Sequence, residues 1–169
     1  MKVEEMIYND SLADFHIPRW EELPDIDLYL DQTVTLIEKY LNKFIGKSEN
    51  KEDKVITKTM INNYVKQQIL EPPVKKKYNK KHIAYLFVIC ILKQVYSIND
   101  IGKLINLATQ KNSPEKAYNK FCIALESAIN FTFLGKEYVD DDKLTAERYI
   151  LKNVVQTFAS KLYVEKVFL

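Results

Sequence analysis

Lysine, asparagine and tyrosine side chains are concentrated between residues 55 and 95, and such side chains bind phosphates and base edges. This stretch holds eight lysines and one acidic residue, Glu71, for a net charge of +7. Residues 1–54 carry −6 and residues 96–169 carry +1. A single basic band in a neutral-to-acidic chain is typical of a surface that faces phosphate groups. A lysine-rich face that is merely solvated is the alternative interpretation.

A short helix is expected to begin at Thr57 or Thr59 and to end by residue 70, with short polar side chains on its outer face. A helix in the DNA major groove needs such donors and acceptors, and asparagine can pair with adenine through two hydrogen bonds. The candidate base-contacting residues are Lys58, Thr59, Asn62, Asn63 and Lys66. Simple solvent exposure is the alternative for Asn62 and Asn63. Core packing is the favoured role of Tyr64.

A basic connector follows the stop formed by Pro72 and Pro73, and it is expected to be a loop or a minimal hairpin. Its lysines can each neutralise a flanking phosphate and release counterions. Tyr78 can donate to a phosphate or pack beneath the connector, and His82, at the start of the next helix, could contact phosphate. The candidate phosphate-contacting residues are Lys75, Lys76, Lys77, Tyr78, Lys80 and Lys81.

No arrangement of residues predicts catalysis, a metal or a cofactor. Cys90 and Cys122 lie in apolar runs without metal-ligand spacing, and the histidines are isolated. The carboxylates at 25, 27 and 31 could hold a divalent ion, but their place at the start of a helix explains them through the helix dipole. Only three glycines are present, which argues against a glycine-rich nucleotide cradle.

The elements that must position these side chains are expected to be helices, since glycine and proline are scarce and apolar residues recur at helical spacing. The expected helices span about 26–44, 57–70, 80–96, 98–109, 114–133 and 144–167. Gly46 and Gly135 end two of them, and Asn79 and Ser97 cap two others. The arm around Trp20 is expected to cover the core through Phe15 and Ile17, or to gate an effector pocket.

The order of these elements resembles the MerR-type winged helix-turn-helix regulators over about a third of the chain. The matching segments are MINNY (60–64), IL (69–70) and PP (72–73). The basic connector KKKYN (75–79) stands in place of the wing, and SINDI (97–101) lies where the next helix begins. Gln68 stands where that family has a glycine, Asn63 replaces the first aromatic residue of a pair, and the connector has no glycine. The resemblance implies an all-α fold of winged helix-turn-helix type with at most a minimal β-hairpin wing.

The whole chain, including PRW and LPDIDLYLDQ, is also similar to an uncharacterised bacterial family, domain of unknown function 1836. This second resemblance brings no assigned activity.

Residues 1–110 are expected to form the helix-turn-helix-like domain with its arm and first helix. Residues 111–169 are expected to form a C-terminal helical pair, packed on the same core or used for dimerisation. Leu125, Ile129, Ile150, Val154 and Phe158 belong to two apolar stripes in this pair, which hold more apolar surface than two helices can bury against each other. Because DNA readers of this kind work as two-fold dimers, a homodimer through these helices is predicted.

The sequence therefore predicts a cytoplasmic transcription regulator that binds DNA, has no enzymatic activity and does not enter a membrane, since its longest apolar run is about half of a membrane span. The alternative hypothesis is a non-enzymatic interaction or scaffolding protein that has the winged-helix shape and does not bind DNA.

Overall fold

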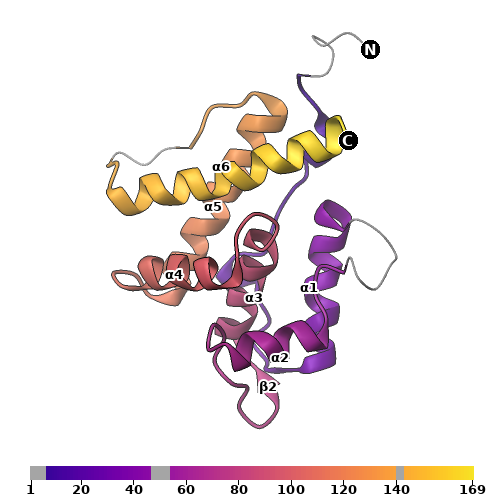
Figure 1. Ribbon diagram of the computed structural model, residues 1–169, viewed down its shortest axis with the longest axis vertical. Coiled ribbons are helices and arrows are strands. Elements are labelled where there is room, and N and C mark those ends of the chain that lie inside the picture. The colour runs from indigo at the N-terminus through magenta and orange to yellow at the C-terminus, as the bar shows by residue number, and fades with distance from the viewer. Residues whose placement is uncertain (1–6, 47–53, 140–142) are drawn as a thin grey trace. The chain divides into compact units, whose positions relative to one another are not determined.

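The computed structural model describes residues 7–46, 54–139 and 143–169, which are mostly helical (Figure 1). The chain divides into two compact units, one formed by Ile17–Tyr118 and the other by the arm up to His16 together with Asn119–Leu169. The all-helical class with a minimal β element is confirmed, since one two-stranded sheet accompanies the helices in the described residues. No helix within those residues is long and apolar enough to cross a membrane.

The unit Ile17–Tyr118 is built around one buried helix, α3 (Lys80–Leu92), which has nine of its 13 residues buried. A helix that is apolar all round must lie in a core, and α3 is contacted by α1, α4 and β2. The other elements of this unit are β1 (Leu28–Tyr29), α1 (Leu30–Ile45), α2 (Lys58–Lys66), β2 (Lys77–Tyr78), α4 (Ile98–Thr109) and the first residues of α5 (Pro114–Leu134). The helix expected from residue 80 is confirmed, but it ends at Leu92 and not at residue 96.

Helix α1 begins at Leu30, so the expectation of a helix from Ile26 is wrong for its first turn. Leu28 and Tyr29 are extended and pair antiparallel with Tyr78 and Lys77 of β2. A chain that hydrogen-bonds sideways to another strand cannot also form helical bonds, which delays the start of the helix. Of the aspartates expected near the helix dipole, only Asp31 lies in the first turn.

Helix α2 ends in a left-handed turn at Gln68, which has a φ angle of +60°. The Gln68 N–H donates to the Val65 carbonyl and the Ile69 N–H donates to the Tyr64 carbonyl, both at 3.0 Å. These two bonds form the Schellman arrangement that usually places glycine at this position. Gln68 therefore adopts a conformation in which glycine is the usual residue.

The arm preceding Asp25 covers the core through its apolar side chains. Ile17 and Leu23 are buried in the unit Ile17–Tyr118, whereas Trp20 is half-buried in a short 3-10 turn, Trp20–Glu22. Phe15, which lies in the other unit, is buried as well. The Tyr118 hydroxyl donates to the Pro18 carbonyl, which ties the arm to α5 within the same unit.

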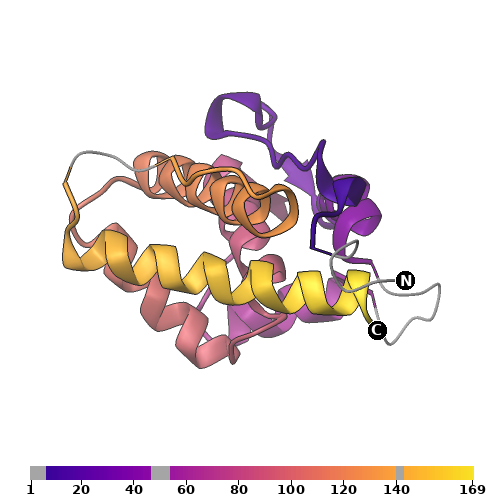
Figure 2. The same cartoon turned by 90° about the horizontal axis from the view of Figure 1, so that it is seen from above.

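The second unit consists of the residues before Ile17, α5 from Asn119 onward, and α6 (Ala146–Val167), which crosses α5 (Figures 1 and 2). The Asn9 N–H donates to the Phe133 carbonyl at 2.8 Å, and the Tyr163 hydroxyl donates to the Ile7 carbonyl at 2.9 Å. Gly135 follows α5 with a φ angle of +68°. The part of the arm before Ile17 thus belongs to the same unit as Asn119–Leu169, whereas the part around Trp20 belongs to the unit Ile17–Tyr118.

Replacement of Gln68 by glycine should raise the free energy of unfolding by about 0.5–1 kcal/mol. A side chain in the left-handed region costs about 1–2 kcal/mol, and glycine removes this cost. Part of the gain is offset because glycine loses more conformational entropy on folding than glutamine does. Urea denaturation followed by circular dichroism measures the change. Gln67→Gly is the matched control, since Gln67 has a φ angle of −80° and should lose stability. Equal losses in both variants would contradict the prediction.

Candidate nucleic-acid interface

Helix α2 presents the five predicted base-contacting residues to solvent. Lys58, Thr59, Asn62, Asn63 and Lys66 are all exposed. Their orientation is fixed from the opposite side of the helix, where Ile61 and Tyr64 are buried in the core. The helix begins at a cap in which the Thr57 hydroxyl accepts the Met60 N–H at 3.1 Å. The outer face of α2 is thus polar and accessible, and core packing of Tyr64 is confirmed.

The basic connector forms a tight two-residue turn, which we call the wing (Val74–Lys77). The Val74 N–H donates to the Lys77 carbonyl at 3.1 Å, and the Lys77 N–H donates to the Val74 carbonyl at 3.0 Å. Lys75 and Lys76 between them have φ angles of +50° and +64°. Positive φ at both central residues defines the turn that favours Asn-Gly in hairpins. The wing instead holds two exposed lysines in this unfavourable conformation.

The segments before and after the wing are joined by His82, which is 3 % exposed. The His82 Nδ1 accepts the Asn79 N–H at 2.9 Å, the Asn79 Oδ1 accepts the His82 N–H at 3.1 Å, and the His82 Nε2 donates to the Pro72 carbonyl at 3.2 Å. A backbone N–H can only donate and a carbonyl can only accept, so the ring is the neutral Nε2–H tautomer. The suggested phosphate contact of His82 is wrong, because both ring nitrogens serve the backbone.

Tyr78 packs beneath the wing rather than pointing to solvent. It is 3 % exposed, its ring meets His82 edge-on at 5.3 Å between centroids, and burial raises its pKa above the ordinary value. Of the two roles expected for Tyr78, packing is the one that the structure shows. Its neighbour Lys77 is half-buried with its ammonium 5.1 Å from the centroid of the Tyr29 ring.

Two of the predicted lysines are held by carboxylates. Lys80 forms an ion pair with Asp25 and Lys81 forms one with Glu71, both at 2.8 Å. The hydrogen bond from Lys81 lowers the pKa of Glu71 and in turn raises the pKa of Lys81. These pairs attach the start of α3 to the segment before β1 and to the segment after α2. The exposed lysines of α2 and of the wing tip therefore stand apart from Lys80 and Lys81, whose charge is already compensated.

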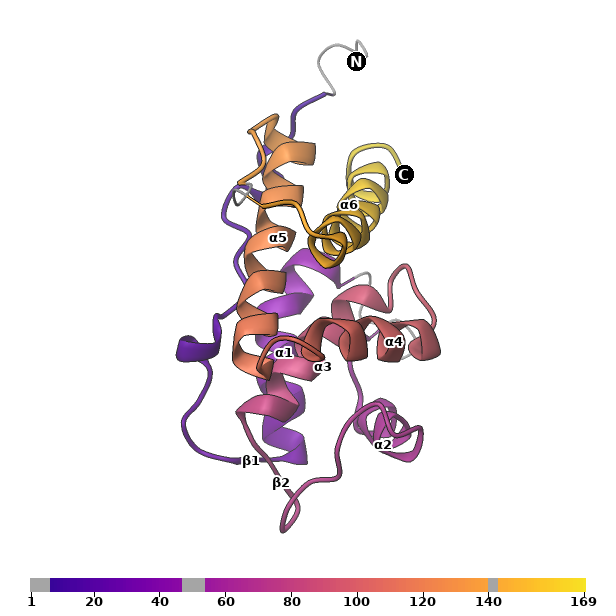
Figure 3. The ribbon, with the colours of Figure 1, turned by 90° about the vertical axis from the view of Figure 1, so that its left-hand side faces the viewer.

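The outer face of α2 and the wing lie at the same end of the unit Ile17–Tyr118 (Figures 1 and 3). Lys93, which follows α3, is a further cation beside α2 that the sequence did not indicate. Its Nζ lies 3.1 Å from the Tyr64 hydroxyl and 3.5 Å from the Met60 sulfur. Twenty-nine residues separate Lys93 from Tyr64, so no local pattern links them.

The remaining reactive side chains offer no second site among the described residues. Cys90 and Cys122 are buried, and burial raises the pKa of the Cys90 thiol to about 12. A thiol that stays protonated is a poor nucleophile. The described part of the chain holds no group of three or more histidine, cysteine or acidic side chains suited to a metal ion.

A family model described as "Domain of unknown function (DUF1836)" matches residues 18–121, a range that contains α2, the wing and Lys93. No curated protein matches the chain, and no solved structure does.

The double replacement Lys75→Asn with Lys76→Gly should stabilise the protein by about 1–2 kcal/mol, because both residues then suit the left-handed turn. For a chain of this size the melting temperature should rise by roughly 2–8 °C, as measured by differential scanning calorimetry. The alanine pair Lys75→Ala with Lys76→Ala removes the same charge and keeps the β-carbons. A gain as large in the alanine pair would show that charge repulsion, not backbone strain, is relieved.

Proposed function

The chain belongs to the DUF1836 family, whose description names no activity, and we propose that this protein is a DNA-binding transcription regulator with a MerR-like winged helix-turn-helix. The observation that carries the proposal is the strained, doubly cationic tip of the wing beside the polar outer face of α2. Strained backbone persists where surrounding structure maintains it, and it is concentrated at functional sites. A turn that only closed a hairpin would gain stability from Asn-Gly, so the lysines serve another purpose.

In the proposed complex α2 enters the major groove and the wing contacts the flanking phosphate backbone. Asn62 and Asn63 offer amide groups to base edges, and adenine is the base that asparagine pairs with best. Lys75 and Lys76 bind phosphates, which positions the helix without reading sequence. The protein acts in the cytoplasm by binding alone, and no catalytic step belongs to this proposal.

The regulator is further proposed to act as a homodimer through α6. Val154 and Phe158 of the predicted stripe are buried within the protomer, as are Val155 and Leu162 of the same helix. The apolar surface that remains exposed on α6 is therefore smaller than the sequence suggested. Ile150, Thr157 and Val164 remain exposed at intervals of seven residues, so they lie on one side of the helix. A two-fold axis at Thr157 would place Ile150 of one protomer against Val164 of its partner, as a self-complementary interface requires.

DNA binding should appear as retardation of genomic fragments, with affinity that falls steeply as salt rises. The double variant Lys75→Asn with Lys76→Gly should lower the slope of log K against log salt by about 1.8, since each phosphate contact contributes about 0.9. Because this variant is expected to be more stable than the parent, weaker binding could not be ascribed to unfolding.

A second variant tests base reading. Asn62→Ala should relax the sequence preference in a selection of bound fragments and leave the salt slope unchanged, because Asn62 carries no charge. If the unmodified protein retards no DNA at low salt, the regulator proposal fails and the interaction-protein alternative is favoured.

Self-association should give a dimer mass in sedimentation equilibrium at micromolar concentrations. Val164→Glu should shift the mass toward that of the monomer, since two carboxylates would be buried opposite Ile150. Lys166→Glu introduces the same side chain two residues away, about 200° around the helix, and should leave the dimer intact. A monomer mass for the unmodified protein, or an equal response to both variants, would contradict the α6 interface.

A further inference from the structure

We infer that Lys93 is a second phosphate anchor on the opposite side of α2 from the wing, so that the reading helix lies between two cationic contacts. This inference rests on the proposed DNA binding. It adds a residue that neither the sequence pattern nor the family description singled out, and it explains why a lysine stands at the end of the core helix beside α2.

Lys93 is held against α2 by neutral groups. Its Nζ donates to the Tyr64 hydroxyl at 3.1 Å and to the Met60 sulfur at 3.5 Å, and it lies 5.7 Å from the centroid of the Tyr64 ring. The lysine side chain is nevertheless exposed. Three contacts restrict a long side chain that would otherwise lose rotamer entropy on binding, so the ammonium is placed before any ligand arrives.

The charge of Lys93 stays uncompensated by these contacts. Burial raises the pKa of Tyr64 far above its ordinary value, so its hydroxyl remains neutral beside the ammonium. Lys80 and Lys81, by comparison, each face a carboxylate at 2.8 Å. Lys80 and Lys81 thus join segments of the fold through ion pairs. Lys93 instead contacts neutral groups, and its positive charge lies next to α2.

The position of Lys93 relative to the wing follows from α3. The wing leads through β2 into the first residue of α3, and Lys93 comes directly after the last one. Thirteen residues of helix span about 20 Å. That distance exceeds the width of the major groove, which is about 12 Å. The wing, which precedes α3, and Lys93, which follows it, are therefore far enough apart to contact the phosphates on both sides of the groove.

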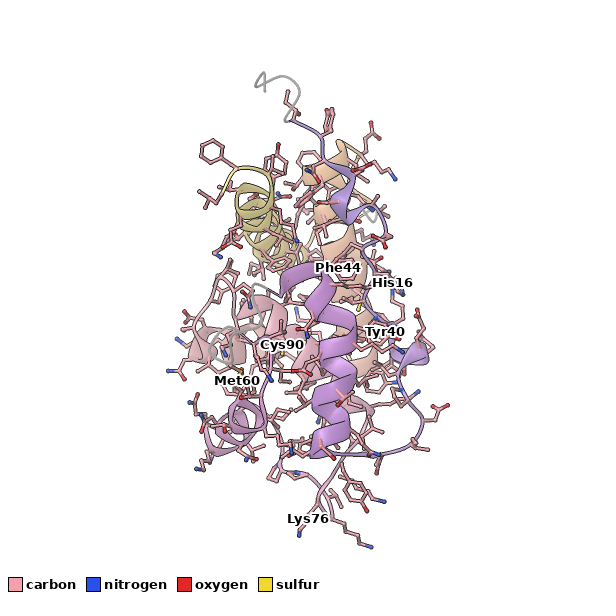
Figure 4. All side chains as sticks on the ribbon, turned by 90° about the vertical axis from the view of Figure 1, so that its right-hand side faces the viewer. His16, Tyr40, Phe44, Met60, Lys76 and Cys90 are labelled. Atoms are coloured by element: carbon pink, nitrogen blue, oxygen red, sulfur yellow. The ribbon has the colours of Figure 1, made fainter. Side chains whose placement is uncertain are left out.

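The side-chain view shows the same arrangement around α2. Met60, which contacts Lys93, and Lys76 at the wing tip lie on opposite sides of this helix (Figure 4). Met60 follows Thr59 directly and lies one turn from Asn63, so Lys93 stands at the border of the outer face rather than behind the helix. Anchors on both borders fix the rotation of α2 about its own axis, whereas one anchor leaves the helix free to roll.

The test compares three single variants of the full chain on one DNA fragment that the unmodified protein binds. Lys93→Gln removes the charge and keeps a donor for Tyr64. It should lower the slope of log K against log salt by about 0.9, which corresponds to about eightfold weaker binding at 0.1 M salt. Lys93→Arg should retain the slope. Lys39→Gln is the matched control, because Lys39 is exposed on α1 about 200° around the helix from the buried Ile37.

Circular dichroism and thermal unfolding of each variant measure whether a change in binding follows from a change in folding. If Lys93→Gln has the same salt slope as the unmodified protein and Lys39→Gln, Lys93 is not a phosphate anchor. The proposed DNA binding is unaffected by that result. A loss in slope that Lys93→Arg also shows overturns the anchor too, since the cation would then not be the cause. If the unmodified protein binds no DNA, the proposed function falls and this inference falls with it.

Discussion

The hydrogen bonds of His82 are the constraint on which the candidate interface depends. One buried imidazole holds the Pro72 carbonyl before the wing and the Asn79 N–H after it, so the wing leaves and rejoins the core at fixed points. From those points β2 pairs with β1, and the pairing in turn sets where α1 begins. Loss of this ring would remove the partner of two part-buried backbone groups, the Pro72 carbonyl and the Asn79 N–H. Because these groups are only partly removed from water, the cost of each should be below the roughly 1–3 kcal/mol of a fully buried group. The wing can therefore tolerate strain at its tip because its base is held by the core.

The lysines of the basic band divide into two groups that their sequence spacing does not distinguish. Lys80 and Lys81 are paired with Asp25 and Glu71, carboxylates that belong to segments before and after α2. Ion pairs at an exposed surface contribute little stability, but they fix which segments meet. Lys75 and Lys76 project from the turn instead, with their backbone in a conformation that favours other residues. Some lysines of the basic band therefore stabilise contacts between segments of the fold, and others are exposed to a partner. The exposed cationic surface is accordingly smaller than the net charge of residues 55–95 suggests.

Local signals in the sequence predicted the helices and their caps well. Asn79 and Ser97 cap α3 and α4 as expected, because a cap involves residues only three positions apart. The start of α1, the burial of Tyr78 and the position of Lys93 could not be predicted in the same way. Each depends on a partner far along the chain, such as the pairing of Leu28 with Tyr78. Gln68 is a different case: its left-handed turn follows from the Schellman bonds, although its residue type argues against that conformation.

The division of the chain into units has a consequence for synthesis. The unit Ile17–Tyr118 is continuous, whereas the arm before it packs with Asn119–Leu169. During translation the continuous unit can leave the ribosome and fold while the segments that hold Asn9 and Ile7, namely those around Phe133 and Tyr163, have not yet been made. The residues before Ile17 are thus made before the continuous unit, and they reach their place only after Tyr163 has been made. The packing of these residues therefore depends on the synthesis of α6, whereas the unit that holds α2 and the wing does not include α6.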